Sequence, residues 1–254
     1  DTTVEPAKAA EANLSEGTTT DVAKTADGVT YATLADAIAA AKDGETVTLL
    51  ADVSEDVTIN KSITLDLGGK TLTGKGTAST ATLTIAKGAT ATVKNGTVNG
   101  TANAYYNIQN NGTATFEDVT ANAGNTGSSM IDNWGTLTIT SGTYTGGLNV
   151  VKSEEDSKLT INGGTFTLNY ATNGYTAVIL VYGDTTITGG EFIQNVATTG
   201  RWNHPMTIMT GLEAGHTAPT TKVTGGTFTI KLSGGNIFWG VGKATSDNFE
   251  VSGG

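Results

Sequence analysis

The segment RWNHP gathers the side chains of this chain that are best suited to binding a ligand. It contains the single arginine of the sequence, Arg201, followed by Trp202, Asn203 and His204. A flat indole face beside guanidinium, amide and imidazole groups fits a sugar ring or a carboxylated glycan. The alternative is that Trp202 seals the side of the fold while Arg201 pairs with an acid such as Glu191.

The two histidines of the chain, His204 and His216, also pose the question of a metal ion. A histidine pair needs at least one further ligand to hold a transition metal, and the sequence identifies none. We therefore expect neither a metal nor a cofactor.

Aromatic residues outside this segment predict a second binding surface. Trp134 and Tyr182 fall on or beside one set of predicted strands, together with Tyr105, Tyr106 and Trp239. Aromatics that point outward from such a set share one side of the molecule, where they suit a glycan or a protein. Side chains alternate along a strand, so about half of them point inward. We predict core packing for Tyr106 and keep Trp134 and Tyr182 as candidate binding residues.

Acidic residues suggest two further kinds of site. The run Glu154, Glu155 and Asp156 has the oxygen ligands that calcium prefers, but adjacent acids on one loop seldom face a single ion, and we favour a solvated loop. A glycosidase needs two carboxyl groups that converge on one groove. The acids on predicted strands are sparse, and no pair is forced together: Asp66, Glu117, Asp118, Asp132, Asp184 and Glu191. We therefore expect no catalytic residues.

A repeated pattern positions these residues. LTINGGTFT (159–167) reappears as LTITSGTYT (137–145), TTITGGEFI (185–193) and TKVTGGTFT (221–229), with weaker copies upstream. Apolar and polar residues alternate on both sides of an Asn-Gly, Ser-Gly or Gly-Gly pair, which indicates two short strands joined by a sharp corner. Repeats of this length indicate a solenoid, in which each turn buries its apolar face against the next.

One interval of the repeat is longer than the others. From Gly190 to Gly226 the chain takes 36 residues, whereas the other intervals take 22 to 28. The additional residues must leave the stack as a loop, and loops on rigid repeats commonly carry binding sites. Arg201 to His204 lie in this interval.

The repeats predict an all-β fold, a right-handed, three-sided parallel β-helix of about 7–8 coils. Before it, Thr33 as N-cap, Asp36 closing a capping box and Gly44 at the end predict a short helix that covers the open end of the ladder. We expect a flexible leader at 1–28, a capping helix within 29–45 and the β-helix over 46–254. The last residues begin a new coil, so we expect the β-helix to stop before its C-terminal cap.

Composition limits the classes of function. The chain has no cysteine, which excludes disulfides and thiolate metal sites. Its net charge of −10 makes nucleic acid and anionic membranes poor partners. No apolar run is long enough to span a bilayer, so we expect no membrane insertion. The chain opens on an aspartate, and we expect a processed form that has lost a secretion signal.

The helix-then-strand opening, the segment DVSEDVTINKSITLDLGGKTLTG (52–74) and the GGTF-type coils resemble a known family. They are similar to the pectate-lyase-like right-handed β-helix of cell-surface proteins from gut and other Gram-positive bacteria. The resemblance covers about residues 29–254. It is specific for fold and not for function, because this scaffold carries lyases, hydrolases and adhesins.

This resemblance implies an extracellular protein, secreted or displayed at the bacterial cell surface as part of a larger cell-wall-attached protein. We expect a non-catalytic, adhesin-like module that binds a host or environmental glycan or glycoprotein. A polysaccharide lyase or glycoside hydrolase on the same scaffold is the alternative, and a purely structural spacer is a further one.

Overall fold

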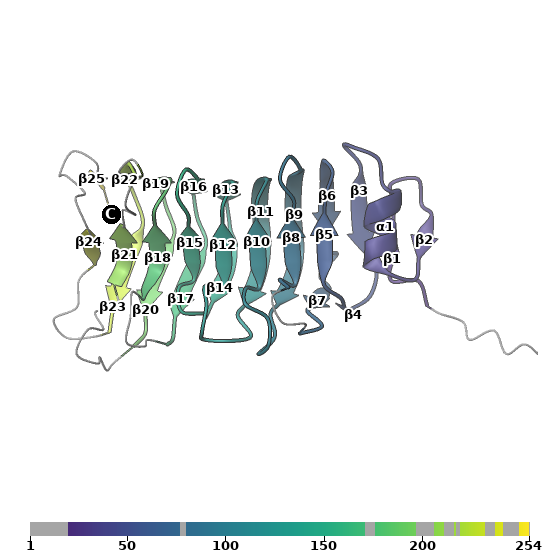
Figure 1. Cartoon of the computed structure of the whole chain (residues 1–254), viewed down its shortest axis with the longest axis horizontal. Helices are drawn as coiled ribbons and strands as arrows, with labels where there is room; N and C mark the ends of the chain where they lie inside the picture. The colour runs from purple at the N-terminus through teal and green to yellow at the C-terminus, as the bar shows by residue number, and fades with distance from the viewer. Residues whose placement is uncertain are drawn as a thin grey trace, which may run out of the picture.

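The computed structural model describes residues 20–76, 80–170, 176–196, 206–210, 216, 219–231, 237–240 and 249–253. In these residues the chain winds as a parallel β-solenoid of about six turns, with one short helix near the N-terminus. Figure 1 shows the turns side by side along the long axis of a rod. The parallel β-solenoid predicted from the repeats is therefore confirmed.

Three columns of parallel strands make up the rod. The first column contains the strand before each corner: β3 (Thr46–Leu49), β6 (Ile63–Asp66), β9 (Thr90–Asn99), β11 (Thr113–Asn122), β13 (Thr136–Ile139), β16 (Lys158–Ile161), β19 (Asp184–Ile187), β22 (Thr221–Val223) and β25 (Phe249–Val251). The second contains the strand after it: β4 (Val53–Ser54), β7 (Thr71–Thr73), the second halves of β9 and β11, β14 (Gly142–Thr145), β17 (Thr165–Leu168), β20 (Glu191–Gln194) and β23 (Thr227–Ile230). Together with the N-terminal β1 (Ala23–Lys24) and β2 (Thr30–Tyr31), they form a 17-stranded sheet.

The third column is a separate sheet of eight strands that faces the viewer in Figure 1. Its members are β5 (Val57–Ile59), β8 (Leu83–Ile85), β10 (Ile108–Asn110), β12 (Ile131–Asn133), β15 (Val151–Ser153), β18 (Ala177–Val181), β21 (Met206–Thr210) and β24 (Phe238–Gly240). About six turns are supported, fewer than the seven or eight predicted, since the last strands are joined through residues outside the described ranges.

The corner between the first two columns is built in two ways. In the later turns the predicted glycine adopts a positive φ, as at Gly142 (118°) and Gly164 (100°), and the strand is interrupted there. In β9 and β11 the positive φ falls one residue earlier, at Asn95 (58°) and Asp118 (51°), and one ten-residue strand runs through the corner. Asn and Asp tolerate this conformation better than other residues with side chains, so the earlier copies need no glycine at that point.

A column of aromatic rings fills the core of the later turns. The apolar position two residues after each corner glycine is occupied by Tyr144, Phe166, Phe192 and Phe228. Successive rings stack with centroids 4.9, 5.1 and 5.0 Å apart and nearly parallel planes. The first three side chains are fully buried. The in-register stacking of turns, which repeats every ~4.8 Å, thus places like side chains in direct contact.

The helix α1 (Leu34–Ala40) lies at the N-terminal end of the rod beside β3, and its buried Leu34, Ala37 and Ile38 join the core. Thr33 is the N-cap as predicted: its side chain accepts from the Asp36 backbone N–H (3.0 Å) and donates to the Asp36 carboxylate (2.7 Å).

Two longer-range contacts complete the helix ends. Glu55 accepts hydrogen bonds from the backbone N–H groups of Leu34 (2.9 Å) and Ala35 (3.1 Å). At the other end, the Lys61 ammonium donates to the carbonyls of Ala39 (2.7 Å) and Ala41 (2.8 Å). The helix ends at Ala40, before the predicted Gly44. Ala41 already has an extended backbone conformation, and Lys61 binds carbonyl oxygens that the end of the helix leaves free.

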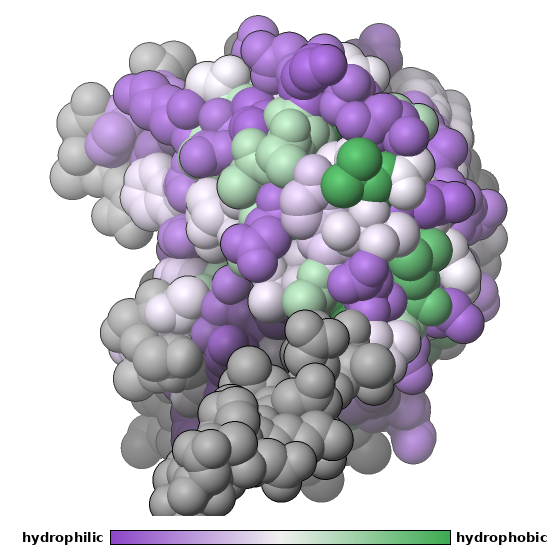
Figure 2. Space-filling model, turned by 90° about the vertical axis from the view of Figure 1, so that its right-hand side faces the viewer, coloured by the Kyte–Doolittle hydropathy of each residue, from purple (hydrophilic) through white to green (hydrophobic). Residues whose placement is uncertain are grey.

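Figure 2 shows this end of the rod, where the described residues are mainly hydrophilic. Val29 and Leu50 are the exposed large apolar side chains of this region. A polar outer surface over a buried helix face is what a solenoid end needs, because an open ladder edge pairs readily with another chain.

We predict that Phe166→Ala lowers the free energy of unfolding by about 3–5 kcal/mol, since it removes the middle ring of the aromatic column and leaves a cavity between two neighbours. Chemical denaturation followed by circular dichroism measures this change. The exposed neighbour Thr143→Ala is the control, expected to change stability by less than about 0.5 kcal/mol. Equal effects of the two changes would show that the ring column does not stabilise the rod.

Candidate functional site

Six polar and aromatic side chains gather where β10, β12, β15 and β18 lie next to each other in the third column. We call them the Lys152 cluster: Gln109, Asp132, Trp134, Lys152, Glu154 and Tyr182. Two of its members were predicted as binding residues from the sequence, and the structure brings them together with a lysine and two acids from neighbouring turns.

The register of the parallel sheet explains why these residues meet. Gln109 pairs with Asp132, and Asp132 pairs with Lys152. Two residues further along the chain, Trp134, Glu154 and Tyr182 also occupy equivalent positions, since the backbone N–H of each donates to the matching carbonyl of the preceding turn. Residues two apart on a strand point to the same side, so both rows lie on one face.

A buried polar ladder on the inner side holds the backbone of the cluster in place. The side-chain amide of Asn110 donates to Asn133 (2.8 Å), and that of Asn133 donates to the Ser153 hydroxyl (3.1 Å). The Ser153 and Ser157 hydroxyls are hydrogen-bonded to each other at 2.7 Å. All four residues are buried, where losing one partner costs about 1–3 kcal/mol. The strand ends that carry Trp134 and Glu154 are therefore rigidly placed.

Asp132 orients the tryptophan. Its Oδ2 accepts from the indole Nε1 of Trp134 at 2.8 Å and from the Gln109 side-chain amide at 3.2 Å. The carboxyl is completely buried, whereas Trp134 is 50% exposed. The indole is thus fixed by its N–H while half of its surface remains open to solvent.

Lys152 links the two carboxyl groups to the aromatic side of the cluster. Its ammonium forms an ion pair with Glu154 and lies 5.4 Å from the ring centroid of Tyr182, a cation–π distance. Burial works against the charge on Lys152, but the hydrogen bond and charge of Glu154, together with Asp132, outweigh it and raise the pKa of the lysine. Lys152 therefore stays charged at neutral pH.

Glu154 titrates near neutrality. Burial raises the pKa of Glu154 to about 7; Lys152 opposes this rise, and the neighbouring Asp132 carboxyl adds to it. One ammonium cannot neutralise two buried carboxylates, so the pair retains a proton that an exposed pair would lose. Among the described residues, the buried Oδ1 of Asp132 has no hydrogen-bond donor.

This arrangement corrects two expectations from the sequence. Glu154 is 4% exposed and does not belong to a solvated loop, because strand alternation continues past Ser153 and directs the side chain back over Lys152. Asp132 and Glu154 also form a convergent carboxyl pair, although the sequence indicated none. Asp156 does fit the predicted exposed loop, and its carboxylate lies 4.0 Å from His216 Nδ1.

A cavity of about 280 Å³ adjoins the Lys152 cluster. Lys152 and Tyr182 of the cluster line it, together with Tyr106, Ser128 and Asn149. Tyr106 is half-buried at the cavity wall, so the prediction that it packs in the core is only partly correct. Burial, and next the charge of Asp132, raise the pKa of its phenol, which therefore remains a neutral hydrogen-bonding group.

The first candidates from the sequence, Arg201, Trp202, Asn203 and His204, lie outside the residues that the structure describes. Sequence reasoning missed Lys152 and the pairing of Asp132 with Glu154. The sequence repeats were aligned on their corners only. Aligning the third strand of each repeat as well would have placed Asp132, Lys152 and Glu154 in adjacent rows of the third column.

Two features are absent from the residues that the structure describes. Among them, no group of three or more histidines and acids lies close enough to hold a metal ion. In the same part of the chain, no helix is long and apolar enough to cross a membrane.

The chain was compared with protein-family models, curated protein sequences and solved structures, and none of them matched significantly. The fold class thus rests on the strand pairing itself, and functional inference rests on the geometry of the Lys152 cluster.

We predict that the cluster makes stability depend on pH. The pKa of Glu154 is higher in the folded protein (about 7) than its ordinary value of 4.5, so the folded state binds the proton more tightly. This contribution, on the order of 3 kcal/mol, is fully present below about pH 4.5 and is lost as the pH rises through about 7.

Denaturation at a series of pH values measures the effect, with Glu154→Gln as the matched control. Glutamine imitates the protonated acid and does not titrate, so the variant should lack this part of the decline between about pH 5 and pH 8. Parallel pH profiles for wild type and variant would contradict the assignment.

Proposed function

We propose that this protein is a non-catalytic, adhesin-like module that binds a host or environmental glycan or glycoprotein through the Lys152 cluster. One observation carries the proposal: the half-exposed indole of Trp134 is locked in place by the buried carboxylate of Asp132, and the neighbouring strand carries Lys152, whose ammonium lies over the ring of Tyr182. Aromatic faces with fixed polar neighbours suit sugars, whose rings combine an apolar C–H face with hydroxyl groups.

The geometry favours binding because the site is formed before any ligand arrives. Trp134 is held by its N–H, Lys152 by Glu154 and Tyr182, and the strand ends by the inner Asn and Ser ladder. A pre-organised site loses little conformational entropy when it binds. Lys152 is also only partly exposed, so its ammonium can present hydrogen atoms to a ligand hydroxyl without leaving its partners.

A carbohydrate-active enzyme is the second candidate, favoured by the convergence of Asp132 and Glu154. A carboxyl group with a pKa of about 7 is suited to general acid catalysis, and a pair of carboxyls is the usual requirement of glycosidases. Against it, Asp132 is completely buried and Glu154 is 4% exposed. Carboxyl groups buried to this extent do not reach a glycosidic bond. We therefore assign to Asp132 and Glu154 the role of positioning Trp134 and Lys152.

The finer description of the fold belongs to the same proposal. We propose a right-handed, three-sided β-helix of the pectate-lyase-like type, displayed at a bacterial cell surface or secreted, as part of a larger cell-wall-attached protein. The in-register parallel columns support the architecture, and the net charge of −10 favours glycans over nucleic acid as partners. Arg201, Trp202, Asn203 and His204 remain proposed additional contacts on the long loop.

We predict that Trp134→Ala weakens glycan binding at least about tenfold, since it removes the exposed aromatic face of the site. Wild type and variant are compared on an array of host and environmental glycans and glycoproteins. Leu50→Ala, at an exposed apolar residue near the N-terminal end of the rod, is the matched control and should bind like wild type.

The same array material is then analysed for products. Binding without new reducing or unsaturated ends fits the recognition module. Cleavage that is lost in Glu154→Gln would establish the enzyme instead. Absence of binding to every glycan and glycoprotein would overturn the proposal and leave a structural spacer.

A further inference from the structure

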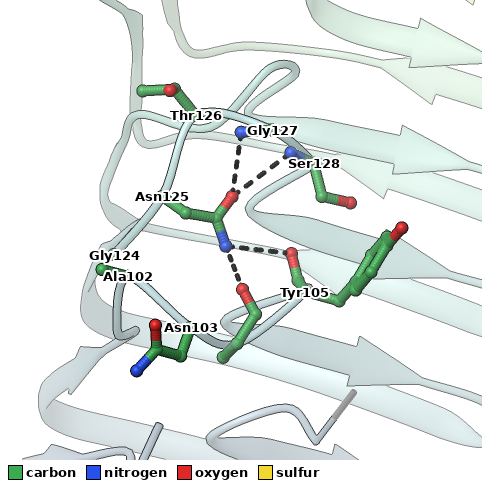
Figure 3. Close-up of a pocket in the computed structure, with 9 residues that line it drawn as sticks. Ala102, Asn103, Tyr105, Gly124, Asn125, Thr126, Gly127 and Ser128 are labelled. Atoms are coloured by element: carbon green, nitrogen blue, oxygen red, sulfur yellow. Dashed lines mark hydrogen bonds between the residues drawn. The ribbon is translucent and has the colours of Figure 1, made fainter. Parts of the chain in front are cut away.

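A second, larger cavity opens on the same side of the rod, between the loops that follow β9 and β11. Its volume is about 610 Å³, and its walls come from 102–105 of one loop and 124–128 of the next. Figure 3 shows these two loops facing each other with Asn125 between them. The functional site described above does not account for this cavity.

Asn125 holds the two loops together. Its side-chain amide donates to the carbonyls of Ala104 and Tyr105, and its Oδ1 accepts from the backbone N–H groups of Gly127 (3.0 Å) and Ser128 (3.2 Å) (Figure 3). Four hydrogen bonds from one side chain fix the cavity wall, so the cavity exists without a ligand.

The larger cavity adjoins the smaller one beside the Lys152 cluster. Gly127 and Ser128 line both cavities. Tyr105 lines the larger and Tyr106 the smaller, and their rings meet edge to face with centroids 5.8 Å apart. From the loop after β9 to Tyr182 after β18, the combined cleft crosses three turn spacings, or about 14 Å along the rod. This span exceeds the length of one sugar ring.

The chemistry of the larger cavity indicates an uncharged ligand. Its lining consists of alanine, glycine, asparagine, threonine, serine and Tyr105, with no charged side chain among them. Tyr105 is 60% exposed, which leaves a broad ring surface for stacking. In the smaller cavity, Lys152 is already paired with Glu154 and lies near Asp132, so an anionic ligand would find no unneutralised cation there.

We propose that this cleft binds a linear, neutral oligosaccharide lengthwise along the rod, with sugar residues in both cavities. The smaller cavity and Trp134 hold one part of the chain, and Tyr105 stacks on a sugar residue in the larger cavity. The inference rests on the proposed glycan-binding function and adds to it the charge, the length and the direction of the ligand.

Calorimetry with neutral oligosaccharides of increasing length tests this inference. The probes are cello-, xylo-, manno- and chito-oligosaccharides of two to about six sugar residues, with oligogalacturonates of the same lengths as acidic counterparts. We expect the wild type to bind the longest members of at least one neutral series about tenfold or more tightly than the dimer. The acidic series should bind more weakly at every length.

Two variants locate the length dependence. Tyr105→Ala and Ala102→Trp, which fills the larger cavity, should abolish the gain with length and leave dimer binding unchanged. Tyr105→Phe keeps the ring and should behave like wild type. Unfolding midpoints equal to wild type show that these changes at exposed loop positions do not disturb the fold.

The outcomes separate this inference from the function on which it rests. Equal affinity for dimer and hexamer, or tighter binding of the acidic series, overturns the lengthwise neutral ligand while leaving glycan binding in place. Loss of dimer binding in Tyr105→Ala also overturns the division into two cavities. Failure of every oligosaccharide to bind overturns this inference, whereas the proposed function is decided separately by the glycan and glycoprotein array.

Discussion

The structure depends on the hydrogen bonding of each turn to the next in exact parallel register. No single turn buries its own apolar face, so the stack is the smallest stable unit. Register repeats each environment every ~4.8 Å, and like side chains come into contact: Tyr144 on Phe166, and Asn110 on Asn133. The same rule that builds the core also builds the surface, because outward residues stack in rows of the same spacing.

The Lys152 cluster is a consequence of this stacking. Asp132 and Lys152 are adjacent in one row, and Trp134, Glu154 and Tyr182 follow each other in the next. Two buried acids in neighbouring turns share one lysine, and burial together with the second carboxyl raises the pKa of Glu154 to about 7. Asp132 holds the half-exposed indole of Trp134 by a hydrogen bond, and Glu154 holds the partly exposed ammonium of Lys152 by an ion pair.

The loops add what the regular strands cannot provide. Strand rows are flat, whereas the segments that enter β10 and β12 rise above the sheet and enclose the larger cavity, fixed by Asn125. The cleft therefore combines a strand-based part, with charged and aromatic side chains, and a loop-based part, with amides, hydroxyls and Tyr105. This division is the physical reason for assigning different portions of one ligand to each.

The sequence by itself determined the solenoid, the inward columns such as Tyr144 to Phe228, and the Thr33 cap, because all of these follow from local periodicity and capping chemistry. It also predicted Trp134 and Tyr182 as binding residues, and this stays a prediction. Tertiary structure alone decided that Glu154 is buried against Lys152, that Asp132 holds Trp134, and that Glu55 and Lys61 close the ends of the helix. The contacts of Glu55 and Lys61 join residues about 20 positions apart, whereas those of Glu154 and Asp132 join residues two positions apart at strand ends. Whether any of them forms depends on the register between turns and on where each strand ends, which local patterns do not specify.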